Sequence, residues 1–409
     1  MKTKTIFALV LSSGALAVSG SPAWQAPAAA AGANDDESKV PAYTLPDPLV
    51  MADGRKVTDA KTWTEKRRPE LLKLFETDVY GRTPVGRPGH MTWEVVSEDR
   101  NAREGTAIEK TITIYFPDEK SASSRMLMNV YMTLPKTGQR VPAFLVAGVG
   151  RSGQPPRFNE PVFDRGYGIV YADILAVQPD QKDEAGGYAS SIRKFYAPAD
   201  QQEPGESEWG ALGSWAWALS RAMDYLQSDK DLDVRRIYLN GVSRYGKAAM
   251  WAGAQDTRFA TTFSGESGCG GAVVVRRQYG ETVRAITGSF PYWFARKFRD
   301  YASDVNALPV DWHELVALHA PRPVYISTAE DDRWGDPRGS FLAAKGAGPV
   351  YALFGETGVG VDEMPPVSTP VGRSIGFHMR TGAHGQNDYD LEQFMSFADK
   401  HYGVPKRPH

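Results

Sequence analysis

The stretch 240–247, Asn-Gly-Val-Ser-Arg-Tyr-Gly-Lys, is the sequence feature that most constrains the fold. It follows a short run of β-branched and aromatic residues at 236–239 and precedes the helix-favouring residues 248–251. A glycine-flanked serine between a strand and a helix is typical of a nucleophile elbow, in which the serine hydroxyl projects beyond the sheet. The helix that follows offers its N-terminal N–H groups to a developing negative charge.

The second glycine of this motif is displaced by one position. Tyr245 stands two residues after Ser243, where the motif has glycine, and the glycine is Gly246. Taken alone, the stretch is equally compatible with an ordinary strand-to-helix turn that a serine caps. The choice between the two interpretations depends on the partners that the rest of the chain supplies.

The apolar pattern alternates between strand and helix along most of the chain. Because buried parallel strands read as short apolar runs, this alternation predicts a mostly parallel central sheet between two helical layers, an α/β sandwich of three layers. Early strands spaced for hairpins predict an antiparallel start. Asp59 is expected to cap the first helix, and Pro69 to begin its second segment. The predicted strands are 111–116, 127–134, 143–147, 168–174, 236–239, 259–263, 323–327 and 350–354, and the predicted helices are 58–79, 214–227 and 390–401.

Residues 1–33 are predicted to form a signal peptide and a small-residue leader. A basic start with Lys2 and Lys4 leads into a mostly apolar run at 6–18, and an alanine-rich stretch extends to residue 32. This order is typical of a secretory signal, and the apolar run is too short to span a bilayer. We therefore expect a protein exported to the periplasm or the medium, with residues 34–409 forming a single catalytic domain that carries an N-terminal extension.

The composition and net charge argue against a disulfide framework, a nucleic-acid partner and a metal site. Cys269 is the only cysteine, so no intramolecular disulfide can form, and we interpret it as a small buried residue. The net charge of −2, with acids and bases interleaved, argues against a nucleic-acid partner. The seven histidines are scattered without the spacing of metal ligands, so neither a metal nor another cofactor is expected. No segment suggests further subunits, and a monomer is predicted.

A serine nucleophile needs a histidine base, and the base needs an acid to orient it. His384 lies in a loop just before the last predicted helix, which agrees with the chain order serine, acid, histidine. His378, six residues earlier, is the competing choice. Two acids are available: Glu266, in a glycine-rich loop after the sixth predicted strand, and Asp332, after the seventh.

Several ordered motifs together resemble the bacterial glucuronoyl esterases, the fifteenth carbohydrate esterase family. The resemblance extends over residues 45–400 and therefore over nearly all of the chain after the leader. Motifs that recur in the same order make it specific. They are 67–72 with 79–82, 241–247 with 266–271, 321–325, 332–337, and 376–378 with 382–384.

This resemblance implies the α/β-hydrolase fold and a serine esterase. The family cleaves the ester between a glucuronic acid carboxyl of xylan and an aromatic alcohol of lignin. By position, Ser243 matches its nucleophile and His384 its base. Glu266 matches the acid of many members, and Asp332 matches the alternative acid of others. We favour Glu266 as the principal acid and Asp332 as a second carboxylate near the same imidazole.

The resemblance also implies a subsite for the substrate. Arg244 matches an arginine that helps to form the oxyanion hole. Lys247 and Glu281 resemble residues that contact sugar hydroxyls, and Trp334 resembles a tryptophan that lines the sugar site. The expected partners are glucuronoxylan–lignin esters or smaller uronate esters.

Two other functions remain open from the sequence. Another secreted carbohydrate esterase, such as an acetyl xylan esterase, would use the same serine and histidine. A carbohydrate-binding relative without catalysis would not need them. Residues 148–151, Gly-Val-Gly-Arg, follow a predicted strand and are left without an assigned role.

Overall fold

A large sheet organises the computed structural model, which describes residues 33–118, 121–148, 159–181 and 184–407. Residues 1–32 of the predicted signal peptide and leader at 1–33, and residues 149–151, lie outside these ranges. The sheet order is β1-β2-β3-β5-β4-β6-β7-β8-β9. Its strands are β1 Thr92–Ala102, β2 Ala107–Asp118, β3 Ser121–Pro135, β4 Val141–Ala147, β5 Gly168–Ala172, β6 Leu232–Val242, β7 Thr261–Gly265, β8 Val324–Ala329 and β9 Ile375–Arg380.

The sheet is antiparallel at one end and parallel over the rest, as predicted. β1, β2, β3 and β5 pair antiparallel, whereas the pairs from β5 through β4, β6, β7 and β8 to β9 are parallel. In the parallel part Val242 of β6 lies opposite Gly265 of β7, and Gly265 lies opposite Ser327 of β8. Ser243 and Glu266, one residue further along, therefore leave the sheet side by side.

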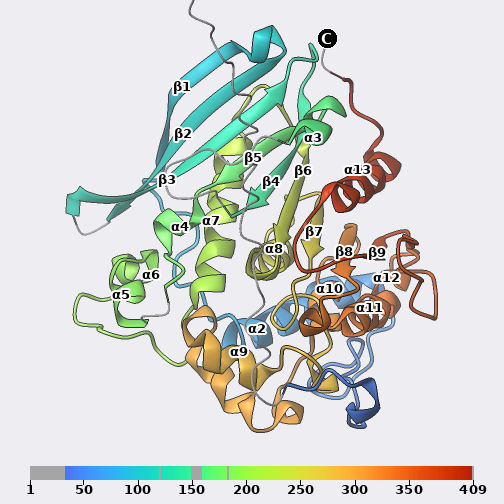
Figure 1. The fold of residues 1–409 in the computed structure, drawn as a ribbon. Helices are drawn as coiled ribbons and strands as arrows, with labels where there is room; N and C mark the ends of the chain where they lie inside the picture. The colour runs from blue at the N-terminus through green and yellow to red at the C-terminus, as the bar shows by residue number, and fades with distance from the viewer. Residues whose placement is uncertain (1–32, 119–120, 149–158, 182–183, 408–409) are drawn as a thin grey trace, which may run out of the picture.

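Successive residues of the central strands face opposite helical layers, because side chains alternate along a strand. In β4, Ala143 and Leu145 join the core that includes α7 (Ala211–Leu226) and α8 (Arg244–Gln255). Phe144 between them joins the core with α13 (Asp388–Tyr402), on the side of α3 (Glu160–Asp164). Figure 1 shows α13 on one side of the parallel strands and α7 and α8 on the other. The three-layer α/β sandwich is confirmed.

The remaining helices surround this frame. They are α1 Ala60–Thr62, α2 Arg68–Asp78, α4 Ile174–Val177, α5 Glu184–Ala189, α6 Ile192–Tyr196, α9 Val283–Ser289, α10 Trp312–Ala317, α11 Pro337–Gly346 and α12 Gly348–Ala352. None of the helices in the described part of the chain has the length and apolar character needed to cross a membrane.

The predicted helix at 58–79 is confirmed, with a change of winding inside it. Asp59 accepts a hydrogen bond from the N–H of Thr62 at 2.8 Å and caps α1. A π-helical segment, Trp63–Arg67, then leads into α2, which has Pro69 in its first turn. The predicted helices at 214–227 and 390–401 correspond to α7 and α13.

One predicted strand is wrong, and two strands of the sheet, β1 and β9, were not predicted. The predicted strand at 350–354 is wrong, because Val350 and Tyr351 belong to the short helix α12 and are buried in the core. A short apolar run does not distinguish a buried strand from a buried helical turn. The strand beside β8 is instead β9, and β1 was not predicted at all. Almost every residue of β1 is exposed, so the strand lacks apolar alternation and is held through its pairing with β2.

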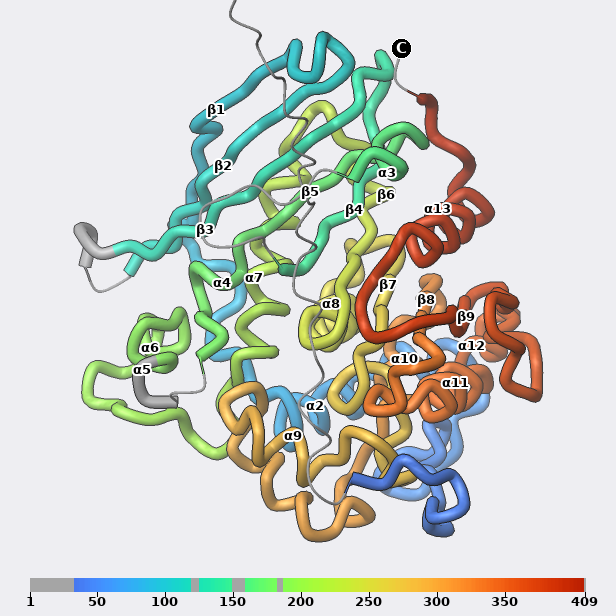
Figure 2. Tube along the Cα trace, viewed as in Figure 1, coloured from blue at the N-terminus to red at the C-terminus, as the bar shows by residue number. Residues whose placement is uncertain are grey.

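The first described residues lie against the loop that precedes Glu281. The N–H of Gly280 donates to the carbonyl of Asn34 at 2.7 Å, and Arg277 donates to the carboxylate of Glu37 at 2.7 Å. In Figure 2 this blue segment lies at the lower edge of the molecule. The N-terminal extension therefore packs on the polypeptide that carries one of the predicted substrate-binding residues.

Replacing Phe263 by alanine is expected to lower the free energy of unfolding by about 3–5 kcal/mol, as for other buried phenylalanines. Phe263 is fully buried, and its ring centroid lies 4.9 Å from that of Phe394 of α13 and 5.4 Å from that of Phe144. Urea denaturation measures the change. Leu127→Ala is the control, because 45% of Leu127 is exposed. Equal losses in both variants would contradict the assignment of this layer as core.

Candidate active site

Ser243 occupies a strained turn between β6 and α8. Its backbone has φ 57° and ψ −129°, a region that residues other than glycine rarely adopt. The N–H of Ser243 donates to the carbonyl of Gly265 at 2.8 Å, which continues the sheet ladder one step into the turn. This is the geometry of a nucleophile elbow.

Close backbone contacts leave little or no space for a side chain at the two glycines around this turn. A Cβ atom on Gly241 would lie 2.2 Å from the carbonyl oxygen of Tyr245, and one on Gly246 would lie 3.0 Å from that of Gly241. The Tyr245 ring packs at 5.8 Å from the Trp215 ring, measured between centroids. It also covers Gly148, where a Cβ atom would lie 2.7 Å from it. The displaced glycine therefore still permits the tight turn.

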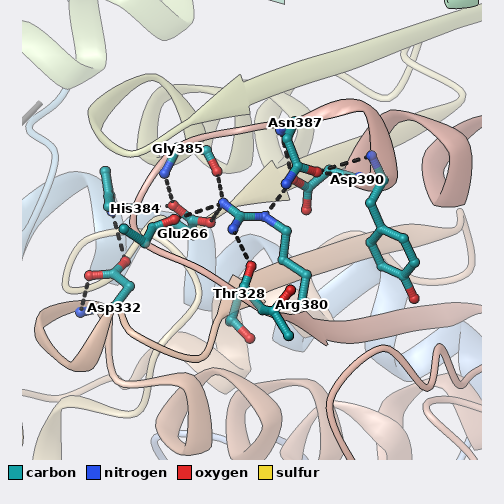
Figure 3. A network of polar contacts seen from close by, with 12 residues as sticks. Glu266, Thr328, Asp332, Arg380, His384, Gly385, Asn387 and Asp390 are labelled. Atoms are coloured by element: carbon teal, nitrogen blue, oxygen red, sulfur yellow. Dashed lines mark hydrogen bonds and ion pairs between the residues drawn. The ribbon is translucent and has the colours of Figure 1, made fainter. Parts of the chain in front are cut away.

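His384 lies in the loop after β9, with both predicted acids at the same ring nitrogen. Its Nδ1 is 2.7 Å from Oδ2 of Asp332 and 3.3 Å from Oε2 of Glu266. Figure 3 shows this convergence. With Nδ1 directed at the carboxylates, Nε2 is the ring nitrogen that can exchange a proton with a hydroxyl group. Asp332, which was predicted to be the second carboxylate, makes the shorter of the two contacts with His384.

Glu266 is buried among charged partners. Its Oε1 accepts a hydrogen bond from Nη2 of Arg380 at 2.6 Å, and its Oε2 accepts one from the N–H of Gly385. Burial, with a smaller contribution from the nearby charge of Asp332, raises the pKa of Glu266 to about 8, against the lowering influence of Gly385 and Arg380. Desolvation of the ionised carboxylate is thus stronger here than the attraction of the guanidinium.

Arg380, at the end of β9, was not predicted from the sequence. It is 4% exposed, and its guanidinium joins Glu266 to Asp390, with Nε 2.8 Å from Oδ2 of Asp390. It also donates to the carbonyls of Thr381, at 2.8 Å, and Ala383, at 3.0 Å. Arg380 therefore fixes the loop that carries His384 (Figure 3). A buried arginine read from a single sequence gives no sign of such partners.

His378, the competing histidine, has another environment. It is fully buried, with Nε2 2.9 Å from Oδ1 of Asp390 and Nδ1 3.0 Å from the hydroxyl of Tyr325. Both ring nitrogens are therefore occupied in the layer next to α13. The site cavity is lined by His384 and not by His378.

Arg244 is the first residue of α8, directly after Ser243. Its guanidinium pairs with Asp180 and lies over the Trp293 ring, 4.9 Å from the centroid. The first N–H groups of a helix have no acceptor within the helix, so the N–H of Arg244 can face an anion beside Ser243. Charge and backbone donors are thus both available next to the serine.

Lys247 and Glu281 form a buried ion pair in the same cavity. The Nζ of Lys247 donates to Glu281 and to the carbonyls of Ser267 and Cys269, each at 2.7 Å. All three ammonium hydrogens are therefore used. The other carboxylate oxygen of Glu281 accepts from Nε1 of Trp334 at 3.3 Å, a long contact.

The side chains of Glu266, Asp332 and His384 are also close enough to serve as metal ligands, because one ligand atom from each lies within 4.8 Å of the others. Each of these atoms already has a protein partner. Asp332 accepts from His384 and from the N–H of Gly335, and Glu266 accepts from Arg380 and Gly385. Hydrogen bonds thus account for the arrangement.

One cavity brings together most of the predicted site residues. Asp332 contacts it through His384. Phe290 and Trp293, whose ring centroids are 3.9 Å apart, stack and form an aromatic wall of the cavity. This wall was not predicted, because aromatic residues of the core and of a binding site look alike in a sequence. The cavity is lined by Ser243, Arg244, Lys247, Glu266, Gly268, Glu281, Ala285, Ile286, Ser289, Phe290, Trp293, Trp334, Gly335 and His384.

Comparison with known proteins identifies the family. A model described as glucuronyl esterase, fungi, matches residues 120–355. The chain is 39% identical over 407 residues to carbohydrate esterase MZ0003 from an unknown prokaryotic organism, covering 90% of this chain and 92% of the relative. The chain belongs to the glucuronoyl esterase family. A curated 4-O-methyl-glucuronoyl methylesterase of Phanerochaete carnosa is 28% identical, covering 79% of this chain and 73% of the relative.

Solved glucuronoyl esterases have the same architecture. A glucuronoyl esterase from Solibacter usitatus superposes with a TM-score of 0.81 at 40% identity, covering 90% of this chain and 100% of the other. A promiscuous esterase of carbohydrate esterase family 15 from a marine bacterial metagenome gives a TM-score of 0.81 at 39% identity, with the same coverage. The family resemblance and the α/β-hydrolase fold are thereby confirmed, and the protein is a carboxylic ester hydrolase.

Replacing Glu266 by glutamine is expected to change how the stability of this esterase varies with pH. The pKa of Glu266 rises from 4.5 to about 8 on folding, so the unfolded chain releases this proton first as pH increases. The carboxyl stabilises the folded state fully below pH 4.5, and this contribution is lost up to about pH 8. Glutamine does not titrate, so the variant should lose less stability across this range.

Urea denaturation of wild type and Glu266→Gln at several pH values measures the effect. Burial also raises the pKa of Glu314 to about 8, and this group titrates in both proteins. The contribution of Glu314 therefore cancels in the comparison. The free energy of unfolding of the variant minus that of the wild type should increase with pH as Glu266 titrates in the wild type. A difference that stays constant with pH would contradict the assignment.

Proposed function

We propose that this protein hydrolyses the ester between the carboxyl group of (4-O-methyl-)glucuronic acid in glucuronoxylan and a lignin alcohol, with Ser243 as nucleophile. The observation that carries the proposal is the single cavity that Ser243, Arg244 and His384 share, with two carboxylates on the imidazole. Membership of the glucuronoyl esterase family and the curated methylesterases of fungi support the uronate ester as substrate.

The proposed reaction is acyl transfer in two steps. Nε2 of His384 takes the proton of the Ser243 hydroxyl while its oxygen attacks the ester carbonyl carbon at C6. The guanidinium of Arg244 and the first N–H groups of α8 stabilise the oxyanion, and His384 returns the proton to the departing alcohol. Water then attacks the acyl-enzyme, with His384 again as base, and the uronic acid is released.

Both acids are proposed to interact with Nδ1 of His384 during catalysis, and to contribute to different extents. Asp332 is the nearer one, at 2.7 Å, and is positioned to orient the ring and to stabilise the imidazolium. Glu266, at 3.3 Å and tied to Arg380, is the second, and because burial raises its pKa to about 8, its carboxyl is mainly ionised only above that pH. Two acids at one nitrogen make each of them partly replaceable.

The sugar is proposed to bind beside Lys247, Glu281 and Trp334. Because the ammonium of Lys247 is already saturated, its main contribution is to hold the Glu281 carboxylate in place. That carboxylate accepts hydroxyl hydrogens, and the Trp334 ring provides an apolar surface for the sugar face. A buried polar group of this kind discriminates against ligands that leave it unpaired.

The reaction is proposed to take place outside the cytoplasm. We propose that residues 1–33 direct export to the periplasm or the medium, and that residues 34–409 act as a single catalytic domain and a monomer. Plant cell-wall polymers lie outside the cell, so an enzyme for glucuronoxylan–lignin esters would have to be exported. Smaller uronate esters are the alternative substrates.

Initial rates on benzyl glucuronate test the proposal, beside an acetyl ester and a methyl galacturonate ester. Ser243→Ala is expected to lower kcat/KM on benzyl glucuronate by at least about 1,000-fold, because the nucleophile of a catalytic triad is lost. Ser228→Ala is the control, since Ser228 is exposed and bonds only to the carbonyl of Tyr225 among the described residues. It should keep the wild-type rate.

The other functions give other outcomes. Serine-dependent cleavage of the acetyl ester alone would assign the protein to the acetyl esterases and discard the uronate pocket. Activity on benzyl glucuronate that survives Ser243→Ala would overturn the mechanism. No turnover on any ester, with no labelling of Ser243 by an organophosphonate, would favour a carbohydrate-binding relative.

The two acids make a separate prediction. Asp332→Asn is expected to lower kcat on benzyl glucuronate by about 100-fold and Glu266→Gln by about 10-fold, both less than the ~10,000-fold loss when a triad has a single acid. The ranking follows from the two distances to Nδ1 of His384, 2.7 and 3.3 Å. Steady-state kinetics at one pH measure it. The opposite ranking would make Glu266 the principal acid.

A further inference from the structure

Asp180 receives three hydrogen bonds beside the candidate oxyanion site. Its Oδ2 accepts from Nη1 of Arg244, and its Oδ1 accepts from the hydroxyl of Tyr292 at 2.5 Å and from Nε1 of Trp293 at 2.9 Å. The carboxylate side chain is 13% exposed. A carboxylate held by three donors at both oxygens is fixed in position and well suited to orient a partner.

The guanidinium of Arg244 is held from two directions. Asp180 binds it at Nη1, and the Trp293 and Phe290 rings lie beneath it, with centroids 4.9 and 5.5 Å away. Among the described residues Asp180 is its only hydrogen-bond acceptor. The remaining N–H groups of the guanidinium are therefore available to the cavity that Arg244 lines with Ser243.

The segment that carries Asp180 is itself anchored to the core. Gln178, two residues earlier, is fully buried, and its carbonyl accepts from Nε1 of Trp215 in α7 at 2.8 Å. Its side-chain oxygen accepts from Nε of Arg193 at 2.9 Å. Asp180 is thus supported by the scaffold and does not depend on a bound substrate for its position.

We infer that Asp180 is a positioning residue for the ester hydrolysis, acting through Arg244. It holds the guanidinium against the Trp293 ring, so that the free N–H groups point to the carbonyl oxygen as Ser243 attacks it. An arginine side chain loses much conformational entropy when it is ordered. If Asp180 orders it before the reaction, this loss does not add to the barrier. The inference rests on the proposed function and adds a role for a residue that lies 64 positions before Arg244 in the chain.

A double-mutant cycle on benzyl glucuronate tests the inference, with wild type, Asp180→Ala, Arg244→Ala and the double variant. Asp180→Ala is expected to lower kcat about 10- to 100-fold with KM changed by less than about 3-fold, a smaller loss than the ~100- to 1,000-fold of a missing oxyanion donor. In the Arg244→Ala background the same substitution should change kcat by less than about 3-fold, because the group that it positions is gone.

Asp180→Asn separates charge from packing. Asparagine keeps an oxygen for Tyr292 and Trp293 but has no negative charge for Arg244, so its kcat should lie between those of wild type and Asp180→Ala. Asp233→Ala is the matched control, because Asp233 is similarly enclosed, at 16% exposure, and pairs with Arg236 at the start of β6. It should keep the wild-type kcat. Thermal unfolding of every variant checks that each is folded.

The outcomes are distinct. Equal fold-losses from Asp180→Ala in both backgrounds, or a change below about 2-fold in the wild-type background, would overturn the positioning role. An increase in KM with kcat unchanged would also overturn the positioning role. If Ser243→Ala keeps its activity, the proposed function fails whatever Asp180 does. If activity depends on Ser243 but the cycle shows no coupling, only the role of Asp180 fails.

Discussion

The site depends on the hydrogen-bond ladder between parallel strands, which continues past the strand ends. The N–H of Ser243 donates to Gly265 and that of Glu266 donates to Ser327, both at 2.8 Å. Each bond repeats the ladder pattern in a residue that has already left the sheet. The proposed nucleophile, Ser243, and the second of the two proposed acids, Glu266, are therefore placed by the backbone, and their separation is set by the spacing between strands. Side-chain contacts refine a geometry that the sheet has already established.

The second constraint is the balance of buried charge around Arg380. One guanidinium lies between the carboxylates of Glu266 and Asp390, and the latter also holds His378. Burial of charge is costly unless every group has partners, and such a network fixes a geometry more than it adds stability. This network links the loop of His384, the proposed base, to α13, so that loop and helix are held as one unit.

The sequence predicted those parts of the molecule that have local signals. Apolar runs located most strands, and the turn residues around Ser243 located the elbow. β1 was not predicted because its residues are mostly exposed and show no apolar alternation. The segment of α12 was predicted as a strand because a five-residue apolar run is too short to show a helical or strand period. Arg380 and Asp180 could not be found in this way. Their partners lie far away along the chain, and only the fold brings them together.

The contact between the N-terminal extension and the loop before Glu281 has a practical meaning for work with this enzyme. Asn34, Asp35 and Glu37 bind Gly280, Tyr279 and Arg277, respectively. These residues come directly after the predicted leader. A recombinant form trimmed beyond Glu37, or one that carries an affinity tag fused at this point, would alter the support of the loop that presents Glu281. A tag placed after the C-terminal end would leave that support intact.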